Sequence, residues 1–280
     1  MFKSNLSILV FLFMFAQGVQ SQDLKIMTYN IKYDNINDTV NNWNDRKESM
    51  LKLIQHYNPT IIGTQEALHH QVMYIDSALL KYSYVGVGRD DGRQKGEYSP
   101  IHYDHTKLKV LQSTTFWLSP TPAKVSVGWD AAMERICTYT LFEDVSNQQK
   151  FYVFNTHFDH IGNLARQNSA QLILEKIKEI NDKQYPVVLM GDLNLGPEEA
   201  PIQYIKMNLD DGKDITHKSF YGPEGTFNGF DAQMKLDRRI DYIFVKSFKV
   251  LSYIHIDDRM ENNKHISDHL PVLASLQKQE

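Results

Sequence analysis

The chain has 280 residues, of which 42% are hydrophobic and 23% charged, and its formal net charge is -4. This composition is that of an ordinary globular protein and is long enough for a large core in one or two domains. The negative balance argues against strong non-specific binding of duplex DNA, which usually requires a basic surface. The single cysteine, Cys137, excludes an intramolecular disulfide framework.

The N-terminal segment has the pattern of a secretory signal peptide. Lys3 precedes an apolar run over residues 6–16, and Val19 and Ser21 place small residues before an expected cleavage site. The run is short for the ~20 apolar residues of a membrane anchor, the alternative interpretation. We therefore expect residues 1–21 to be a signal peptide, residues 22–280 to form one exported domain, periplasmic or extracellular, and the mature chain not to insert stably in a membrane.

From residue 24 onward, short strand-like runs alternate with helical patterns. Asn44 or Asp45 is expected to cap a first helix that runs to about residue 57, and the strongest helical periodicity covers residues 165–180. Strands are expected at residues 24–30, 59–66, 84–88, 99–103, 108–118, 136–142, 151–155, 187–191, 239–245, 250–256 and 271–275. Many strands with few helices between them predict a two-sheet core with helices outside.

Polar side chains stand at the ends of several apolar runs. Asp192 and Asn194 are spaced two apart, so in extended chain they would share one face. Similar polar groups, at or just after a run or just before the next, are Asn30, Glu66, His157 with Asp159 and His160, and Asp268 with His269. Oxygen ligands with few imidazoles favour Mg²⁺ or Mn²⁺ over zinc. A P-loop, a Gly-x-Ser-x-Gly elbow and a cysteine nucleophile are not indicated, which leaves metal-assisted hydrolysis.

Six motifs then occur in the order of a known superfamily. They are Thr28-Tyr-Asn30, Gln65-Glu66, Thr156-His157, Gly191-Asp-Leu-Asn194, Arg239-Ile-Asp-Tyr242 and Ser267-Asp-His269. Over residues 24–277 the chain resembles the endonuclease/exonuclease/phosphatase superfamily. The resemblance implies an α/β fold, a DNase I-like four-layer α/β/β/α sandwich of two packed mixed sheets with the site at one end. It also implies metal-dependent cleavage of a phosphate ester.

The resemblance further implies a role for each matching residue. Glu66 would hold the metal, Mg²⁺ or Mn²⁺, with Asn30 and Asp268 beside it. Asp192 and Asn194 would address the attacking water and a phosphoryl oxygen. Whether one or two metal ions are bound stays open.

Two histidines would complete the chemistry. His269 would lie near the scissile phosphate with Asp241 fixing its orientation, and His157 would donate to a non-bridging oxygen with Glu97 supporting it. Asp192 is the preferred general base and His269 the competing one.

The segment after His157 has two interpretations. Asp159 and His160 would either cap the helix that starts near residue 165, or His160 or Arg166 would contact a substrate phosphate. A basic cluster of Lys235, Arg238 and Arg239 could also hold a phosphate, and the aromatic residues Tyr33, Trp43, Trp129 and Phe230 could stack a base or sugar.

The motifs also favour one branch of the superfamily. Ala67-Leu68 follows Glu66 where abasic-site endonucleases have Thr-Lys, and the remaining motifs resemble the secreted bacterial and deadenylase-like branch. The expected substrate is a small or short phosphate ester, diester or monoester, including a short oligonucleotide. A sphingomyelinase is the alternative, although Thr115-Phe-Trp-Leu118 resembles a buried strand more than a membrane wedge. A catalytically silent binding module of the same fold is less favoured, because Glu66, Asp192 and His269 are all present. Protein partners cannot be inferred.

Overall fold

The computed structural model of the protein describes residues 23–218 and 220–279. The expected signal peptide, residues 1–21, lies outside the described residues. Within these ranges, no helix is both long enough and apolar enough to cross a membrane. The helices are α1 (Trp43–Tyr57), α2 (His69–Ala78), α3 (Asn163–Ile180) and α4 (Ala200–Lys206). The strands are β1 (Leu24–Asn30), β2 (Ile61–Gln65), β3 (Tyr82–Val85), β4 (Ile101–Asp104), β5 (Leu108–Trp117), β6 (Ile136–Asp144), β7 (Lys150–His157), β8 (Val187–Asp192), β9 (Asp210–Asp211), β10 (Asp241–Lys246), β11 (Phe248–His255) and β12 (Val272–Lys278).

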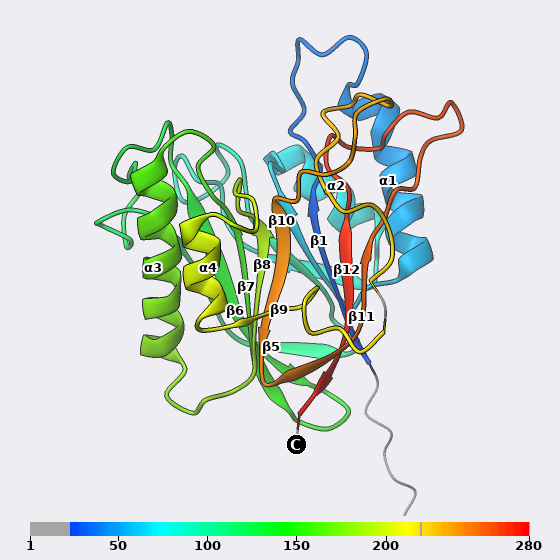
Figure 1. Ribbon diagram of the computed structural model, residues 1–280. Coiled ribbons are helices and arrows are strands. Elements are labelled where there is room, and N and C mark those ends of the chain that lie inside the picture. Colours follow the sequence, from blue (N-terminus) through cyan, green and yellow to red (C-terminus); the bar gives the residue numbers. More distant parts are fainter. Residues whose placement is uncertain (1–22, 219, 280) are drawn as a thin grey trace, which may run out of the picture.

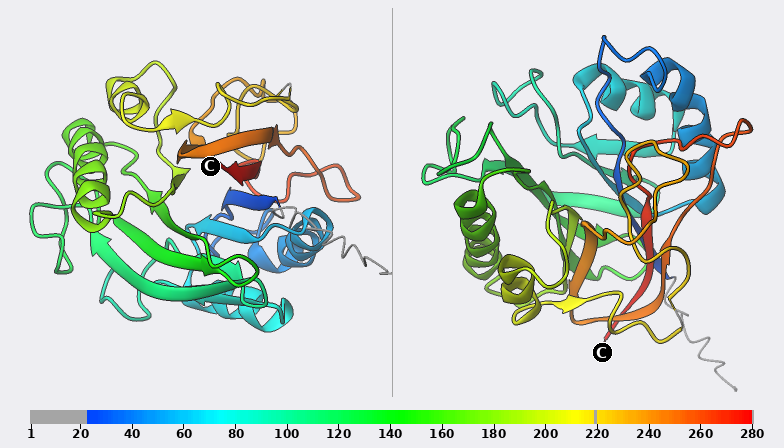
Figure 2. Two further views of the ribbon diagram at one scale, coloured as in Figure 1. Left: turned by 90° about the horizontal axis from the view of Figure 1, so that it is seen from below. Right: turned by 45° about the horizontal axis from the view of Figure 1, so that its top comes forward.

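Two six-stranded sheets pack face to face with helices on the outer faces (Figures 1 and 2). The first sheet has the order β11-β12-β1-β2-β4-β3 and the second β5-β6-β7-β8-β10-β9. Both sheets are mixed, because β1 runs parallel to β2 and β7 parallel to β8 while the other neighbours are antiparallel. The expected four-layer α/β/β/α sandwich is confirmed.

The apolar runs of the central strands explain the layers. In β8, Val188 and Met190 belong to the core between the two sheets, whereas Val187 and Leu189 belong to the core that the second sheet forms with α3 and α4. Successive side chains of a strand point to opposite faces, so a strand covered on both sides must be apolar at every position. In β1, Ile26 faces the inner core and Met27 the layer containing α1 and α2.

The helix predictions were partly wrong. Helix α1 begins at Trp43, and its cap is Asn42, whose side chain accepts a hydrogen bond of 3.2 Å from the Asp45 amide; neither Asn44 nor Asp45 is the cap. Helices α2 and α4 were not predicted. Helix α2 buries only three side chains, and α4 has seven residues, so neither shows a clear apolar period.

The strand predictions placed every long strand but not always its ends. The strand expected at residues 84–88 is β3, which ends at Val85, because Gly86 has a φ of 129° and turns the chain. Phe116 and Trp117, in the segment considered as a membrane wedge, are 5% and 7% exposed. That segment is a buried strand, as the sequence predicted.

The topology brings the polar strand ends to one end of the sandwich, opposite the C-terminus in Figure 1. Strands β1, β2, β7 and β8 end there, and β10 and β12 begin there: Asn30 pairs with Gln65, and Asp192 pairs with both His157 and Asp241. A hydrogen bond of 2.6 Å from Gln65 Nε2 to Asn155 Oδ1 links the two sheets beneath this end.

A glycine makes this close approach of the sheets possible. A Cβ atom on Gly63 would lie 2.5 Å from Met190 Cε and 2.7 Å from Asn155 Cγ, in the opposite sheet. Any larger residue would force the sheets apart just below the site.

Candidate active site

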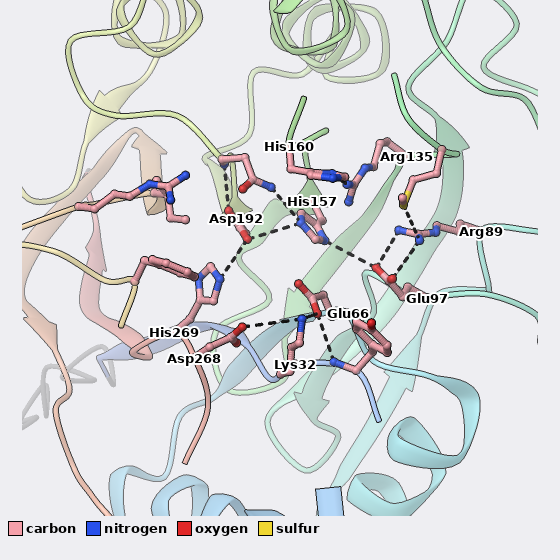
Figure 3. Close-up of a pocket in the computed structure, with 16 residues that line it drawn as sticks. Lys32, Glu66, Arg89, Glu97, Arg135, His157, His160, Asp192, Asp268 and His269 are labelled. Atoms are coloured by element: carbon pink, nitrogen blue, oxygen red, sulfur yellow. Dashed lines mark hydrogen bonds and ion pairs between the residues drawn. The ribbon is translucent and has the colours of Figure 1, made fainter. Parts of the chain in front are cut away.

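A cavity of about 550 Å³ opens at this end of the sandwich (Figure 3). Ligand sites commonly have volumes of 300–1,000 Å³, so the cavity suits a small molecule. It is lined by Lys32, Tyr33, Glu66, Arg89, Glu97, Met133, Arg135, His157, His160, Asp192, Asn194, Phe227, Arg238, Ile240, Asp268 and His269. Both sheets contribute, so the site lies at the seam between them.

One carboxylate pair, Glu66 and Asp268, lies around an ammonium group. Lys32 Nζ is 3.4 Å from Glu66 Oε2 and 3.8 Å from Asp268 Oδ2. Burial raises the pKa of Asp268; at Glu66 the nearby Lys32 and His269 outweigh burial and lower the pKa. Two hard oxygen donors that already face a cation fit a divalent metal such as Mg²⁺.

Asn30 was predicted to stand beside the metal, and its amide is turned the other way. Its Nδ2 donates to Glu66 Oε1 at 3.1 Å and to Asp192 Oδ2 at 2.9 Å. Its Oδ1, the atom that would ligate a metal, accepts the Lys32 amide at 3.1 Å. In this arrangement the Asn30 amide group hydrogen-bonds the two carboxylates, and its role as a metal ligand stays a prediction.

A second carboxylate pair, Asp192 and Asp241, flanks His269. The imidazole Nδ1 lies 2.9 Å from Asp241 Oδ2, and Nε2 lies 3.7 Å from Asp192 Oδ2. Burial alone would lower the pKa of His269, but the two carboxylates raise it to about 10. Burial raises the pKa of Asp192 to about 7 against the opposing effect of His269. Asp241 also accepts a hydrogen bond of 2.6 Å from Thr226 Oγ1, so the carboxylate that contacts His269 Nδ1 is itself fixed in position.

The three residues Asp192, Asp241 and His269 are close enough to hold a metal ion, since one ligand atom from each lies within 4.8 Å of the others. The imidazole would have to lose its proton first, and its raised pKa opposes that. The Glu66–Asp268 pair, which already faces the Lys32 ammonium, is the position that the sequence predicted for the metal.

His157 and Asn194 lie on the other side of Asp192. His157 Nε2 is 3.5 Å from Asp192 Oδ2 and 3.1 Å from the side-chain Nδ2 of Asn194. The backbone amide of Asn194 donates to Asp192 Oδ1 at 2.9 Å. Burial, together with Arg135 and Arg89, lowers the pKa of His157 well below its ordinary value, which favours the neutral imidazole. Because the Asn194 Nδ2 group can only donate to Nε2, the single proton of this neutral imidazole lies on Nδ1, on the side of Glu97.

The predicted support of His157 by Glu97 is not made by a hydrogen bond. Glu97 Oε2 lies 3.9 Å from His157 Nδ1. Its direct partner is Arg89, which donates two hydrogen bonds of 2.7 and 2.9 Å to the carboxylate. Glu97 orients a guanidinium in the cavity wall first, and acts on the imidazole only through proximity.

The segment between His157 and α3, together with the first turn of α3, contains the residues expected either to cap the helix or to contact a phosphate. Asp159 accepts from the amides of Ile161 and Gly162 at 3.0 and 2.7 Å, just before α3 begins at Asn163. Asp130, in a distant loop, caps the next amides. Arg166 does not line the cavity and donates to the carbonyls of His160 and Asn194. Of the two residues expected to contact a substrate phosphate, His160 lines the cavity and Arg166 does not.

The basic cluster divides in the same way. Lys235 is exposed and pairs with Asp237 at 2.9 Å, and Arg239 is buried against Asp211. Arg238 does line the cavity, with its guanidinium 5.0 Å from the centre of the Phe227 ring. Of the aromatic residues proposed for stacking, Tyr33 lines the cavity. Trp43, the first residue of α1, is buried in the core between this helix and the first sheet.

Three cationic wall residues were missed by sequence reasoning: Lys32, Arg89 and Arg135. Arg135 Nε lies 3.2 Å from Asp159 Oδ1, and its Nη2 lies 2.9 Å from His160 Nδ1. All three stand in or beside loops, and no periodic pattern marks such positions. Only the general expectation that an anionic substrate needs cations could have suggested them.

Backbone strain is concentrated in the same place. Lys32, Glu66 and Asn194 have φ values of 56°, 61° and 51°, a region that side chains other than glycine rarely adopt. Such conformations often occur at functional sites because the surrounding contacts hold them. The strain marks these three as residues whose direction is fixed by their neighbours.

Residues 27–269 match the Endonuclease/Exonuclease/phosphatase family. The chain belongs to this family, whose members are hydrolases acting on phosphoesters.

Three relatives illustrate the similarity. An endonuclease/exonuclease/phosphatase structure from Bacteroides vulgatus is 38% identical, covers 92% of this chain and 100% of its own, and has a TM-score of 0.88. The mannosyl-6-phosphatase of Bacteroides thetaiotaomicron is 36% identical, with 91% and 99% covered and a TM-score of 0.87. An uncharacterized protein of Acanthamoeba polyphaga mimivirus is 28% identical over 84% of this chain and 92% of its own length.

Proposed function

We propose that this protein is a divalent-metal-dependent phosphoesterase that cleaves small phosphate esters by in-line attack of water. The observation that carries the proposal is the buried Asp192–His269 pair at the base of a cation-lined cavity. A carboxylate and an imidazolium side by side can accept one proton and donate another.

The metal, Mg²⁺ or Mn²⁺, would be held by Glu66 and Asp268. When bound it would supply positive charge to a phosphoryl oxygen and to the leaving group. Lys32, whose ammonium faces the same carboxylates, adds a further positive charge to this side of the cavity.

Asp192 acts as the general base in this proposal. Its pKa, raised to about 7 by burial, suits proton acceptance near neutral pH. His269 is unsuited to the task because its raised pKa, about 10, keeps it protonated. Hydrogen bonds from Asn30 and from the Asn194 amide hold the Asp192 carboxylate in place.

The remaining polar groups donate to the phosphate. Protonated His269, oriented by Asp241, presents Nε2 toward the same space as Asp192 Oδ2. On the opposite side, His157 and Asn194, which hydrogen-bond each other, present neutral polar groups to the cavity. Donors fixed before the reaction stabilise charge that builds on the phosphoryl oxygens.

Phosphomonoesters of sugars are the preferred substrate class. The cavity of about 550 Å³ has room for a monosaccharide phosphate, and its wall carries Arg89, Arg135 and Arg238, which suit a dianionic group. The 36% identity to a mannosyl-6-phosphatase supports the same class. A phosphodiester such as a short oligonucleotide is the second candidate, because Tyr33 and Phe227 line the cavity where a base could stack.

Two other functions have less support. A sphingomyelinase needs an apolar element to enter a bilayer, and the nearest candidate segment is a buried strand. A catalytically silent binding module would not need the proton donors and acceptors formed by Asp192, Asp241 and His269. We also propose export of the mature chain after removal of residues 1–21, which release of the mature form into the periplasm or medium would test.

The decisive experiment is hydrolysis by residues 22–280 of mannose 6-phosphate, p-nitrophenyl phosphate, bis-p-nitrophenyl phosphate, short single-stranded DNA and RNA, and sphingomyelin. Each is assayed with Mg²⁺, with Mn²⁺ and with EDTA. Chelator-sensitive monoester turnover above diester turnover is expected. Turnover that is insensitive to EDTA would contradict metal dependence, and no turnover of any ester would favour the binding module.

A further inference from the structure

The ammonium of Lys32 occupies the position between Glu66 and Asp268, the two carboxylates proposed to bind the metal. Its Nζ approaches Glu66 and Asp268 to 3.4 and 3.8 Å and lies 4.5 Å from the centre of the Tyr33 ring. Figure 3 shows it between the two acids. An internal cation therefore faces the same two carboxylates that a divalent ion would use.

The backbone directs this side chain into the cavity. Lys32 has a φ of 56°, its amide donates to Asn30 Oδ1, and its carbonyl accepts from Gln71 Nε2 at 3.1 Å and from Arg46 Nη2 at 3.3 Å. Gln71 and Arg46 are buried, at 0% and 1% exposure. The surrounding structure thus fixes a strained backbone so that a lysine points at two acids.

We propose that Lys32 is a built-in counter-cation, which neutralises the Glu66–Asp268 pair in the metal-free protein and competes with the divalent metal for it. The proposal rests on the proposed function, because the metal is part of that function. Two carboxylates carry a charge of -2, and an ammonium within 4 Å of both offsets half of it. The same ammonium repels an incoming divalent ion, more strongly in a partly buried site than in water.

The side chain can yield without unfolding the site. It is 24% exposed, and a lysine carries its charge on a flexible four-carbon stem. The neighbouring Tyr33 ring offers the displaced ammonium a face to rest on. Lys32 would therefore set the metal concentration at which the enzyme becomes active, and would oppose binding of a second ion.

The test is a Mn²⁺ titration without substrate, by calorimetry and by electron paramagnetic resonance of the free ion. Lys32→Met is expected to bind Mn²⁺ roughly tenfold more tightly than the wild type, since it removes a positive charge that lies 3.4 and 3.8 Å from the two carboxylates. Lys32→Arg, which keeps the charge, should stay within about threefold. Lys47→Met is the matched control, because Lys47 also lies over a tyrosine ring, Tyr74 at 5.2 Å, but hydrogen-bonds Asn44.

A second measurement does not depend on binding curves. Without metal, Lys32→Met should melt at a lower temperature than the wild type, and saturating Mn²⁺ should raise its Tm by more, because the unneutralised carboxylates gain more from the ion. Lys32→Gln provides the same comparison if Lys32→Met does not fold.

Unchanged or weaker Mn²⁺ binding by Lys32→Met and Lys32→Gln would overturn the proposal, and a raised KM with unchanged Mn²⁺ affinity would assign Lys32 to the substrate instead. If wild-type turnover stays sensitive to EDTA, either result removes only this inference. A wild type that binds no Mn²⁺ and hydrolyses esters in EDTA would remove the proposed metal dependence as well.

Discussion

Two carboxylate pairs face the same cavity, each around one cation, and they differ in how firmly the cation is held. His269, between Asp192 and Asp241, has a side chain that is 5% exposed and a contact of 2.9 Å to its partner. Lys32, between Glu66 and Asp268, is 24% exposed and comes no closer than 3.4 Å. The burial of the cation and its distance from the carboxylates therefore distinguish the two pairs. A buried, closely held imidazolium suits proton transfer, and a more exposed, loosely held ammonium suits exchange for a metal ion.

Substitutions in the Asp192–His269 pair are expected to have the largest effect on activity. Asp192→Asn should lower kcat roughly a hundredfold or more at saturating Mn²⁺, the scale of losing a general base, and His269→Ala should do the same by removing a charge-stabilising donor. Steady-state kinetics on p-nitrophenyl phosphate would measure this, with the melting temperature as a control for folding. Near-wild-type rates in both variants would contradict the assigned roles.

Glu66→Gln tests the proposed metal-binding role of the other carboxylate pair. It removes half of the exchangeable pair's negative charge, so the Mn²⁺ concentration for half-maximal activity should rise about tenfold or more. Much of kcat should return at saturating metal, which Asp192→Asn should not allow. A metal titration of activity for both variants would decide this, and an unchanged midpoint in Glu66→Gln would remove it as a ligand.

Arg238 offers a smaller effect outside both pairs. Its guanidinium stacks on Phe227, and among the described residues it makes no ion pair with a carboxylate, unlike Arg89 and Arg135. Arg238→Gln should raise KM for a sugar phosphate about fivefold to tenfold with little change in kcat, as expected for loss of one charged hydrogen bond. Lys235→Gln is the control, since Lys235 is 87% exposed and pairs with Asp237. Equal KM values for both variants would exclude Arg238 from substrate binding.

His102 tests what a buried imidazole does without carboxylates. Burial lowers its pKa to about 4, and the only polar group within reach among the described residues is Thr64 Oγ1 at 3.5 Å. The unfolded chain binds this proton below pH 6.5 and the folded protein only near pH 4, so stability falls as pH drops from 6.5 to 4. His102→Phe should make the fall in Tm over this window smaller by roughly 7–14 °C, measured by calorimetry, because the difference between the folded and unfolded pKa corresponds to about 3–4 kcal/mol. An identical slope would show that other groups govern it.

Much of the fold was predictable because several of its central strands contain long apolar runs. Runs such as residues 187–191 can only be buried on both faces, and a two-sheet core follows. The ends were also visible, since Asp192, His157 and Glu66 interrupt those runs. Helix α2 was missed because its sequence starts with two histidines and a glutamine and packs only Gln71, Val72 and Ile75 inward.

The wall of the site could not be predicted in the same way. Arg135 and Asp159 are 24 positions apart, and only the packing of two loops brings them together. The direction of the Asn30 amide depends on Glu66 and Asp192 acting as acceptors, which are known only in three dimensions. Side-chain direction in loops follows from neighbours and not from sequence spacing.

The position of the site at the seam between the sheets has a consequence for how the protein would lose activity. Glu66 follows β2 and His269 precedes β12 of the first sheet, whereas Asp192 and Asp241 belong to β8 and β10 of the second. A slight separation of the two sheets would therefore move Asp192 and Asp241 away from His269 while every strand stayed intact. Turnover in graded urea should thus decline before the strand signal in circular dichroism, through a sub-global opening. The rate of turnover would then report how closely the two sheets are packed against each other at the site.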